Sequence, residues 1–250
     1  MITASPIAEE TVRAEWESAL VGAAKLKERG AKRLFNSTPN IEQAFVLKGR
    51  SLVCVDEGIA YGIHLPGSGV LMSTDQRRAE IKNAGIEEFT THENCGAFRM
   101  AFPNETNPNQ ACQEWGRREA DALGLPYRHI NVGELDRPPE LHTALVAYYD
   151  GTGVFNRIPG LPRGFVISRK HFSTAKEDLE LRLMNIFRNF GFGKLFTREN
   201  PLYLIALAHP TDPSLSAKIL EAEARHAAAG YGAPVRVEAI RTNWLMRSQV

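Results

Sequence analysis

The chain has 250 residues, enough for one large domain, or a domain and a half, with a sizeable hydrophobic core. Thirty Lys and Arg against 29 Asp and Glu give a formal net charge of +1, so we expect no basic surface and no nucleic-acid partner. The N-terminus lacks a signal-peptide pattern and no apolar run approaches the roughly 20 residues of a membrane span, so we expect a cytoplasmic protein with no membrane partner.

Short apolar runs alternate with amphipathic segments along the chain. Apolar residues recur at helical spacing over residues 8–34, which predicts one amphipathic helix or two short ones. Further along, we distinguish strands from helices by the periodicity of the apolar residues, by glycines at the boundaries and by capping residues. We expect strands within residues 51–58, 60–72, 86–92, 127–132, 164–170, 201–209 and 235–240, and helices within residues 73–85, 95–102, 107–124, 173–191 and 212–230.

This alternation predicts an α/β fold with a mainly parallel central sheet flanked by helices. A stretch rich in Pro and Gly at residues 156–164 suggests a boundary. We expect an N-terminal helical arm over residues 1–40, an α/β core over 41–160, and a C-terminal α/β portion over 161–250 packed on that core. Functional side chains of such sheets gather at the carboxyl ends of the strands.

Two of these strand ends carry soft metal ligands. Only three cysteines occur, Cys54, Cys95 and Cys112, too few for a disulfide scaffold, so we expect ligand or core roles. Cys54 ends one predicted strand, and His92 ends another, shortly before Cys95 at a predicted helix start. Zinc favours thiolate and imidazole, and three protein ligands with an open position are typical of a catalytic site. Cys54, His92 and Cys95 are therefore candidate zinc ligands, and Cys112 is a core residue.

Asp56 lies two residues after Cys54, and because side chains alternate along a strand it points to the same side. It would orient a water molecule, accept its proton, or compete as a fourth ligand. Gly96, directly after Cys95, permits close packing at the start of the helix, whose N-terminal dipole favours a neighbouring thiolate.

The pattern Cys54-x-Asp56 followed by His92-x-x-Cys95-Gly96-Ala97 resembles the zinc signature of the β-class carbonic anhydrases. The segments HLPGSG (64–69) and VAYYDGTGVF (146–155) are loosely similar to a glycine turn and a late strand of that family. The resemblance implies that Cys54, His92 and Cys95 hold Zn²⁺ and that Asp56 assists catalysis. The implied reaction is reversible hydration of carbon dioxide to bicarbonate by zinc-bound hydroxide. The resemblance also implies a homodimer or higher homo-oligomer, with active sites near the subunit interface.

One departure from the family affects Asp56. The family motif continues Cys-x-Asp-x-Arg, with the arginine holding the aspartate away from the metal, whereas this chain has Gly58 at that position. The nearest arginines in the sequence that would replace it are Arg77, Arg78 and Arg99. Without such a partner, Asp56 would ligate zinc and close the site.

Further residues near the two motifs are candidates for binding substrate or supporting the ligands. They lie next to Asp56, in the glycine turn, after Cys95 and on the first helix of the core: Glu57, Gly67, Ser68, Gly69, Gly96, Arg77 and Arg78.

Two alternative functions remain open from the sequence. The first is a related zinc hydrolase of carbonyl sulfide or carbon disulfide, because the same hydroxide attack would serve. The second is a non-catalytic, regulatory zinc-binding protein whose site is closed by Asp56.

Overall fold

The structure is a computed structural model that describes residues 6–138, 142, 145–189, 195–232 and 234–242. Two four-stranded sheets form its frame, and every strand pair in them is parallel. The first sheet has the order β2-β1-β3-β4, with β1 at Ser51–Val53, β2 at Ile63–His64, β3 at Glu88–His92 and β4 at Tyr127–Ile130. The second has the order β6-β5-β7-β8, with β5 at Val146–Asp150, β6 at Phe165–Ser168, β7 at Leu202–Ala208 and β8 at Val235–Arg241.

Helices connect the strands in the same way in both halves. The second strand of each sheet leads into α2 (Thr74–Asn83) or α5 (Ala175–Met184), and the last strand follows α4 (Pro108–Leu123) or α6 (Ala217–Ala228). The first half adds the short helix α3 (Gly96–Ala101). Short 3₁₀ segments lie at Ile41–Phe45, Pro66–Gly69, Val132–Glu134 and Pro213–Leu215, and a π-helical turn at Asn185–Asn189 continues α5. The chain thus contains two α/β units of one topology, in agreement with the predicted α/β fold.

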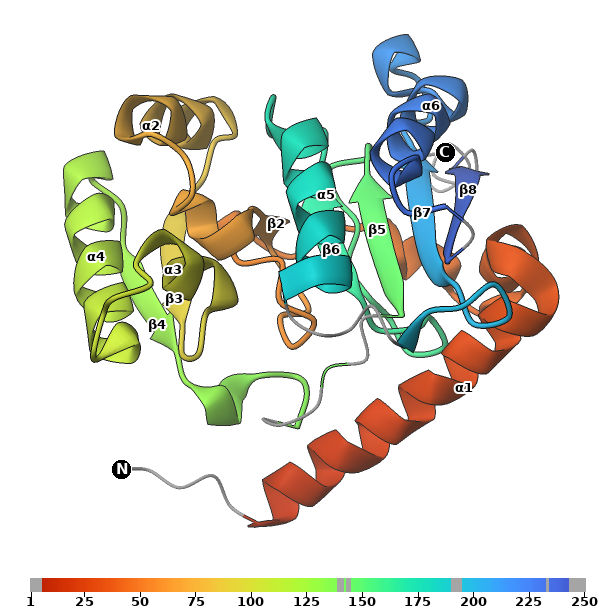
Figure 1. The fold of residues 1–250 in the computed structure, drawn as a ribbon, viewed down its shortest axis with the longest axis horizontal. Helices are drawn as coiled ribbons and strands as arrows, with labels where there is room; N and C mark the ends of the chain where they lie inside the picture. The colour runs from red at the N-terminus through yellow and green to blue at the C-terminus, as the bar shows by residue number, and fades with distance from the viewer. Residues whose placement is uncertain (1–5, 139–141, 143–144, 190–194, 233, 243–250) are drawn as a thin grey trace.

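The two sheets meet at their β2 and β6 edges, in the middle of the molecule (Figure 1). The backbone N–H of His64 on β2 donates to Ser168 Oγ at the end of β6, at 2.9 Å. One buried apolar cluster runs from Leu52 and Phe89 in the first sheet to Ile167 and Leu204 in the second. The carboxyl ends of strands from both halves therefore share one packed core.

The segment 146–155 has a different role from the one expected of it. The sequence analysis placed it with the first α/β unit, but β5 pairs with β6 and β7 in the second sheet. The carboxylate of Asp150 ends this strand by accepting bonds from the backbone N–H groups of Thr152 and Gly153, at 2.8 and 3.1 Å. Asp150 thus stabilises its own turn.

The N-terminal arm is a long helix, α1 (Pro6–Ser37), interrupted at Gly30, where φ is 75°. Leu26, before the break, and Leu34 and Phe35, after it, are buried against the second sheet. Glu238 on β8 accepts a hydrogen bond from the N–H of Ala31, the residue after the break, at 2.8 Å. Figure 1 shows the helix running obliquely beside the C-terminal half.

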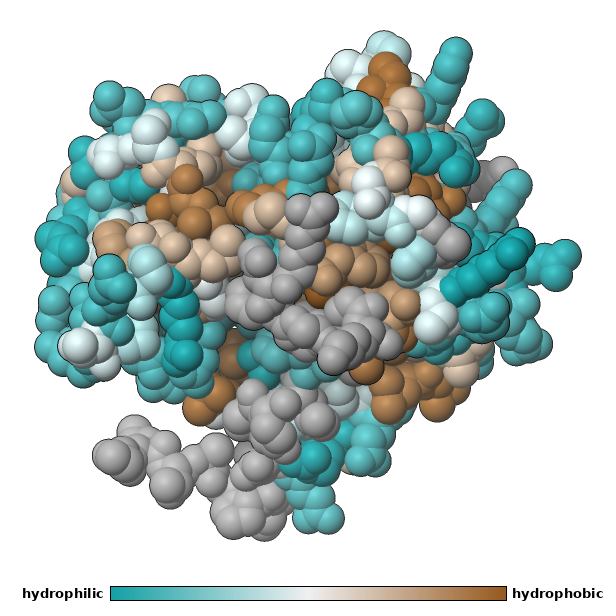
Figure 2. All heavy atoms as spheres, in the orientation of Figure 1, coloured by the Kyte–Doolittle hydropathy of each residue, from teal (hydrophilic) through white to brown (hydrophobic). Residues whose placement is uncertain are grey.

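Hydrophilic side chains cover most of the face seen in Figure 2, and hydrophobic ones gather over its middle. Among the described helices, none is both long and apolar enough to cross a membrane.

The contact between β5 and β6 leads to a stability prediction. A Cβ on Gly164, just before β6, would lie 2.3 Å from the carbonyl oxygen of Val146 on β5. We expect Gly164→Ala to lower the free energy of unfolding by about 1–3 kcal/mol, because the strands must separate to make room. Gly230→Ala is the matched control, since a Cβ there meets nothing within 4 Å. Urea unfolding measures both, and equal stability of the two variants would contradict the described packing.

Candidate metal centre

Three potential ligands converge where β1 and β3 end. The two strands are parallel neighbours, with Leu52 opposite Phe89, so their carboxyl ends lie side by side. Cys54 follows β1, His92 is the last residue of β3, and Cys95 directly precedes α3. Their ligand atoms all lie within 4.8 Å of one another, and all three side chains are buried. A group this compact could hold one metal ion, whose bonds to nitrogen and sulfur are about 2.0–2.3 Å long, after small side-chain shifts.

The hydrogen bonding of His92 fits a metal ligand. Its Nδ1 lies 2.8 Å from the carbonyl oxygen of Glu93, and because a carbonyl only accepts, Nδ1 carries the proton. In the neutral ring this leaves a lone pair on Nε2, which is buried without a hydrogen-bond partner in the described part of the chain. Metal-bound histidines commonly donate their other ring N–H to such an oxygen. The cluster therefore offers two thiols and a correctly oriented imidazole.

The charges of the cluster also favour a cation. A hydrogen bond from Cys95 and the charge of His92 hold the pKa of Cys54 well below its ordinary value, although burial opposes this. Burial alone would lower the pKa of His92, but the Cys54 thiolate raises it to about 9. The hydrogen bond to Cys54, together with burial, raises the pKa of Cys95. A bound divalent cation would favour both thiolates and the neutral imidazole.

The glycine turn predicted to lie near the site supports Cys54. The N–H of Gly67 donates to Cys54 Sγ at 3.2 Å. Gly67 has φ +53°, and a Cβ there would lie 2.7 Å from that of Ala97, so only glycine brings the backbone this close. Ser68 donates its hydroxyl to the Thr90 carbonyl on β3, at 2.6 Å. The carbonyl of Gly69 accepts from Arg77 at 3.3 Å, so Ser68 and Gly69 hold the turn in place.

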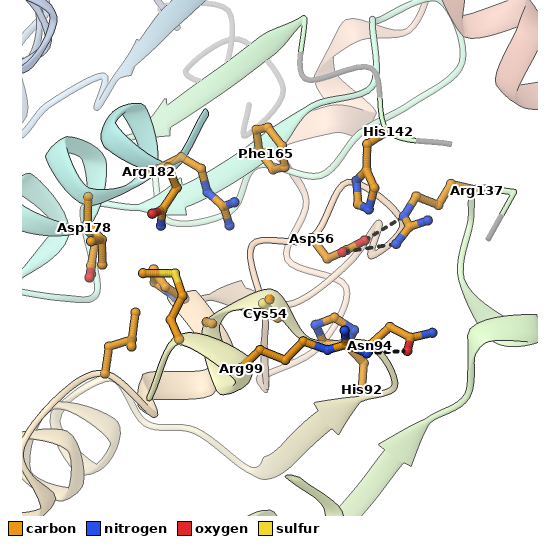
Figure 3. A pocket seen from close by; sticks show the side chains of 17 residues that line it. Cys54, Asp56, His92, Asn94, Arg99, Arg137, His142, Phe165, Asp178 and Arg182 are labelled. Carbon is orange, nitrogen blue, oxygen red and sulfur yellow. Dashed lines mark hydrogen bonds and ion pairs between the residues drawn. The ribbon is translucent and has the colours of Figure 1, made fainter. Parts of the chain in front are cut away.

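Asp56 is held by Arg137, a residue that the sequence analysis did not single out. Arg137 Nε lies 3.0 Å from Asp56 Oδ1 and its Nη2 lies 3.4 Å from Oδ2 (Figure 3). Oδ1 also accepts from the N–H of Gly58 at 2.8 Å. Although burial opposes ionisation, the charges of His92 and Arg137 hold the pKa of Asp56 well below its ordinary value. Asp56 is thus an ionised carboxylate with a fixed orientation.

The expectation that Arg77, Arg78 or Arg99 partners Asp56 is wrong. Helix α2 directs Arg77 and Arg78 towards Glu119 on α4, at 2.8 and 3.2 Å. Arg99 lies at the cavity and donates to Asn94 Oδ1 at 3.4 Å.

The geometry also explains the glycine where the family motif has arginine. A Cβ on Gly58 would lie 2.7 Å from Cγ of Arg137 and 3.0 Å from Cβ of Leu135. The stem of Arg137 therefore fills the space that a side chain at position 58 would need. Arg137, 81 positions from Asp56 in the sequence, thus both binds that carboxylate and requires glycine at position 58.

Glu57 lies outside the cavity. Its carboxylate is fully buried, with Oε2 at 3.8 Å from Nδ1 of His142, and its backbone carbonyl accepts from Arg157. His142 does line the cavity, and burial lowers its pKa to about 4. Nothing in the sequence around His142 indicated this position.

A cavity of about 440 Å³ opens in front of the cluster. Cys54, Asp56 and His92 line one side, and Gly96 and Arg99 belong to the same half. The opposite wall comes from β6, α5 and the turn after it (Figure 3) and consists of Phe165, Asp178, Leu181, Arg182 and Asn185. The C-terminal half is therefore part of the candidate site, which the sequence analysis did not predict.

Comparison of the chain with models of known protein families, with curated proteins and with solved structures gave no match.

The buried ion pair leads to a second stability prediction. The side chains of Arg137 and Asp56 are only 3% and 11% exposed. We expect Arg137→Gln to lower the free energy of unfolding by about 3–5 kcal/mol, because it leaves a buried carboxylate without its partner. The double variant Asp56→Asn/Arg137→Gln should recover part of this loss. A double-mutant cycle in urea measures the coupling, and additive effects of the single changes would contradict a direct interaction.

Proposed function

We propose that this chain is a zinc enzyme that reversibly hydrates carbon dioxide to bicarbonate, as its resemblance to the β-class carbonic anhydrases implies. The observation that carries the proposal is the convergence of Cys54, His92 and Cys95 within 4.8 Å, at the bottom of a cavity that Asp56 also lines. Two sulfur ligands and one nitrogen ligand suit zinc better than magnesium or calcium, which prefer oxygen.

Zinc at this position would supply Lewis acidity, which lowers the pKa of water from 15.7 to about 7 and makes hydroxide available at neutral pH. The chain prepares the site for that chemistry. The Glu93 carbonyl orients the His92 ring, and the Gly67 N–H stabilises the negative charge of Cys54. Three protein ligands leave a fourth position for a small molecule.

Asp56 is the proposed orienting group for the reacting water, since the low pKa that Arg137 and His92 give it makes its carboxylate a hydrogen-bond acceptor rather than a base. Its ionised carboxylate is bound by Arg137 and by the Gly58 N–H, and it lines the cavity. An oxygen that keeps a free lone pair can accept a hydrogen bond from a reacting water or from the hydroxyl of bicarbonate. Because Arg137 fixes the carboxylate, the geometry favours this role over ligation of the metal.

The alternatives differ in how the structure bears on them. A hydrolase of carbonyl sulfide or carbon disulfide would use the same residues, so substrate assays must separate it from hydration. A regulatory protein with a site closed by Asp56 is less favoured, because Arg137 holds both carboxylate oxygens. The homo-oligomer and the cytoplasmic location stay predictions of the sequence.

The first test is the metal content. We expect about one zinc per chain in protein purified with zinc and dialysed, measured by elemental mass spectrometry. Cys54→Ser, His92→Ala and Cys95→Ser should each lose most of it, because two ligands bind zinc weakly. Cys112→Ser is the matched control, since Cys112 is buried on α4 outside the cluster. Equal zinc in all five proteins would contradict the ligand set.

The second test is the reaction. We expect the zinc-loaded protein to accelerate carbon dioxide hydration in stopped flow, and Asp56→Asn to reduce kcat/KM by about 10²–10⁴-fold with zinc retained. Cys112→Ser should keep full activity. Stoichiometric zinc without hydration at any pH from 6.5 to 9, our chosen range, would refute the proposal and direct assays to carbonyl sulfide and carbon disulfide.

A further inference from the structure

The cavity in front of the cluster contains a guanidinium group that forms no ion pair with any described carboxylate. Arg182, at the end of α5, points into the cavity (Figure 3). Its Cζ lies 4.4 Å from the ring centroid of Phe165, so the aromatic ring supports the guanidinium from one side. Within the described residues, the structure shows no hydrogen bond or ion pair to the guanidinium of Arg182. Its donor groups are thus available to a ligand.

The other charged groups of the cavity leave it net positive. Arg137 neutralises Asp56, and Arg99 binds only the neutral amide of Asn94. Asp178 lies one helical turn before Arg182, but its Oδ2 accepts from Thr174 Oγ at 3.2 Å. Burial raises the pKa of Asp178 to about 7, so near neutral pH its carboxyl group is partly protonated and opposes an anion only weakly. His142 is largely neutral there, because burial lowers its pKa to about 4.

The volume of the cavity and its apolar lining indicate which kind of anion it can bind. A volume of about 440 Å³ lies within the range of roughly 300–1,000 Å³ typical of sites for small organic ligands. Carbon dioxide has three atoms and needs little of this space. Apolar side chains line the rest of the cavity, namely Leu71, Met100, Phe165 and Leu181. This lining suits a carbon skeleton, while Arg182 suits a carboxylate, with which guanidinium forms paired hydrogen bonds.

We infer that this cavity is a binding site for small organic carboxylates, with Arg182 from the C-terminal half as the anchor. The carbon skeleton of the ligand packs on Phe165 and Leu181, and the occupied cavity restricts access to the Cys54, His92 and Cys95 cluster. The binding itself does not depend on the proposed hydration. Where hydration occurs, an organic carboxylate is expected to inhibit it.

Benzoate is a suitable probe, because it combines an apolar ring with one carboxylate, and benzamide is its neutral counterpart. We expect calorimetry to show one saturable benzoate site per chain, with benzamide bound at least tenfold more weakly. Arg182→Gln should weaken benzoate binding about 10- to 100-fold, as expected for loss of a charged hydrogen bond. Arg182→Lys should bind benzoate with intermediate affinity, because an ammonium keeps the charge but not the paired hydrogen bonds. Lys176→Gln is the matched control, since it removes an exposed charge from the same helix and should change nothing.

Zinc content is measured on every sample, because a carboxylate can also bind a metal directly. Binding that follows Arg182 at constant zinc supports the inference. The absence of saturable benzoate binding would overturn it, and so would equal binding by Arg182→Gln and the wild type. Benzoate binding that follows the zinc content, or equally tight binding of benzamide, would overturn it as well. A protein that hydrates carbon dioxide but does not bind benzoate leaves the proposed function standing. A protein that binds benzoate through Arg182 without hydration leaves this inference standing.

Discussion

The ion pair between Arg137 and Asp56 determines what the candidate metal site at Cys54, His92 and Cys95 can do. Asp56 lies two residues from Cys54 and lines the same cavity, so without a partner its carboxylate would be a competing ligand for any metal ion that the cluster holds. Arg137 occupies both carboxylate oxygens, and the N–H of Gly58 adds a third hydrogen bond. The same contact explains Gly58, because the stem of Arg137 leaves no room for a side chain there. The proposed orienting role of Asp56 therefore depends on a residue from the segment after β4.

The two halves of the chain have one topology but different roles in the site. The first half supplies the cluster and Asp56, while the second supplies the opposite wall through β6 and α5. The resemblance to the β-class carbonic anhydrases predicts active sites near a subunit interface. In this chain the facing residues Phe165 and Arg182 come from the same polypeptide, and the His64 to Ser168 hydrogen bond helps to hold the two sheets together.

Local patterns predicted the elements and the cluster well. The strand and helix segments match the structure because they are determined locally, by the periodicity of apolar residues, by glycines at the boundaries and by capping residues within a few positions. The convergence of Cys54 with His92 follows from two strand ends of a parallel sheet. Three features depended on long-range packing instead. Arg137 reaches Asp56 through the path of the segment after β4, β5 joins the second sheet, and α5 closes the cavity.

The most direct test of the account is a crystal structure of the zinc-loaded protein with an anomalous difference map at the zinc edge. The account predicts one peak bonded to Cys54 Sγ, His92 Nε2 and Cys95 Sγ, at about 2.3 Å from sulfur and 2.0–2.1 Å from nitrogen. Asp56 should remain paired with Arg137, and the fourth position should hold no protein atom. An Asp56 oxygen in that fourth position, or no peak among the three residues, would contradict it.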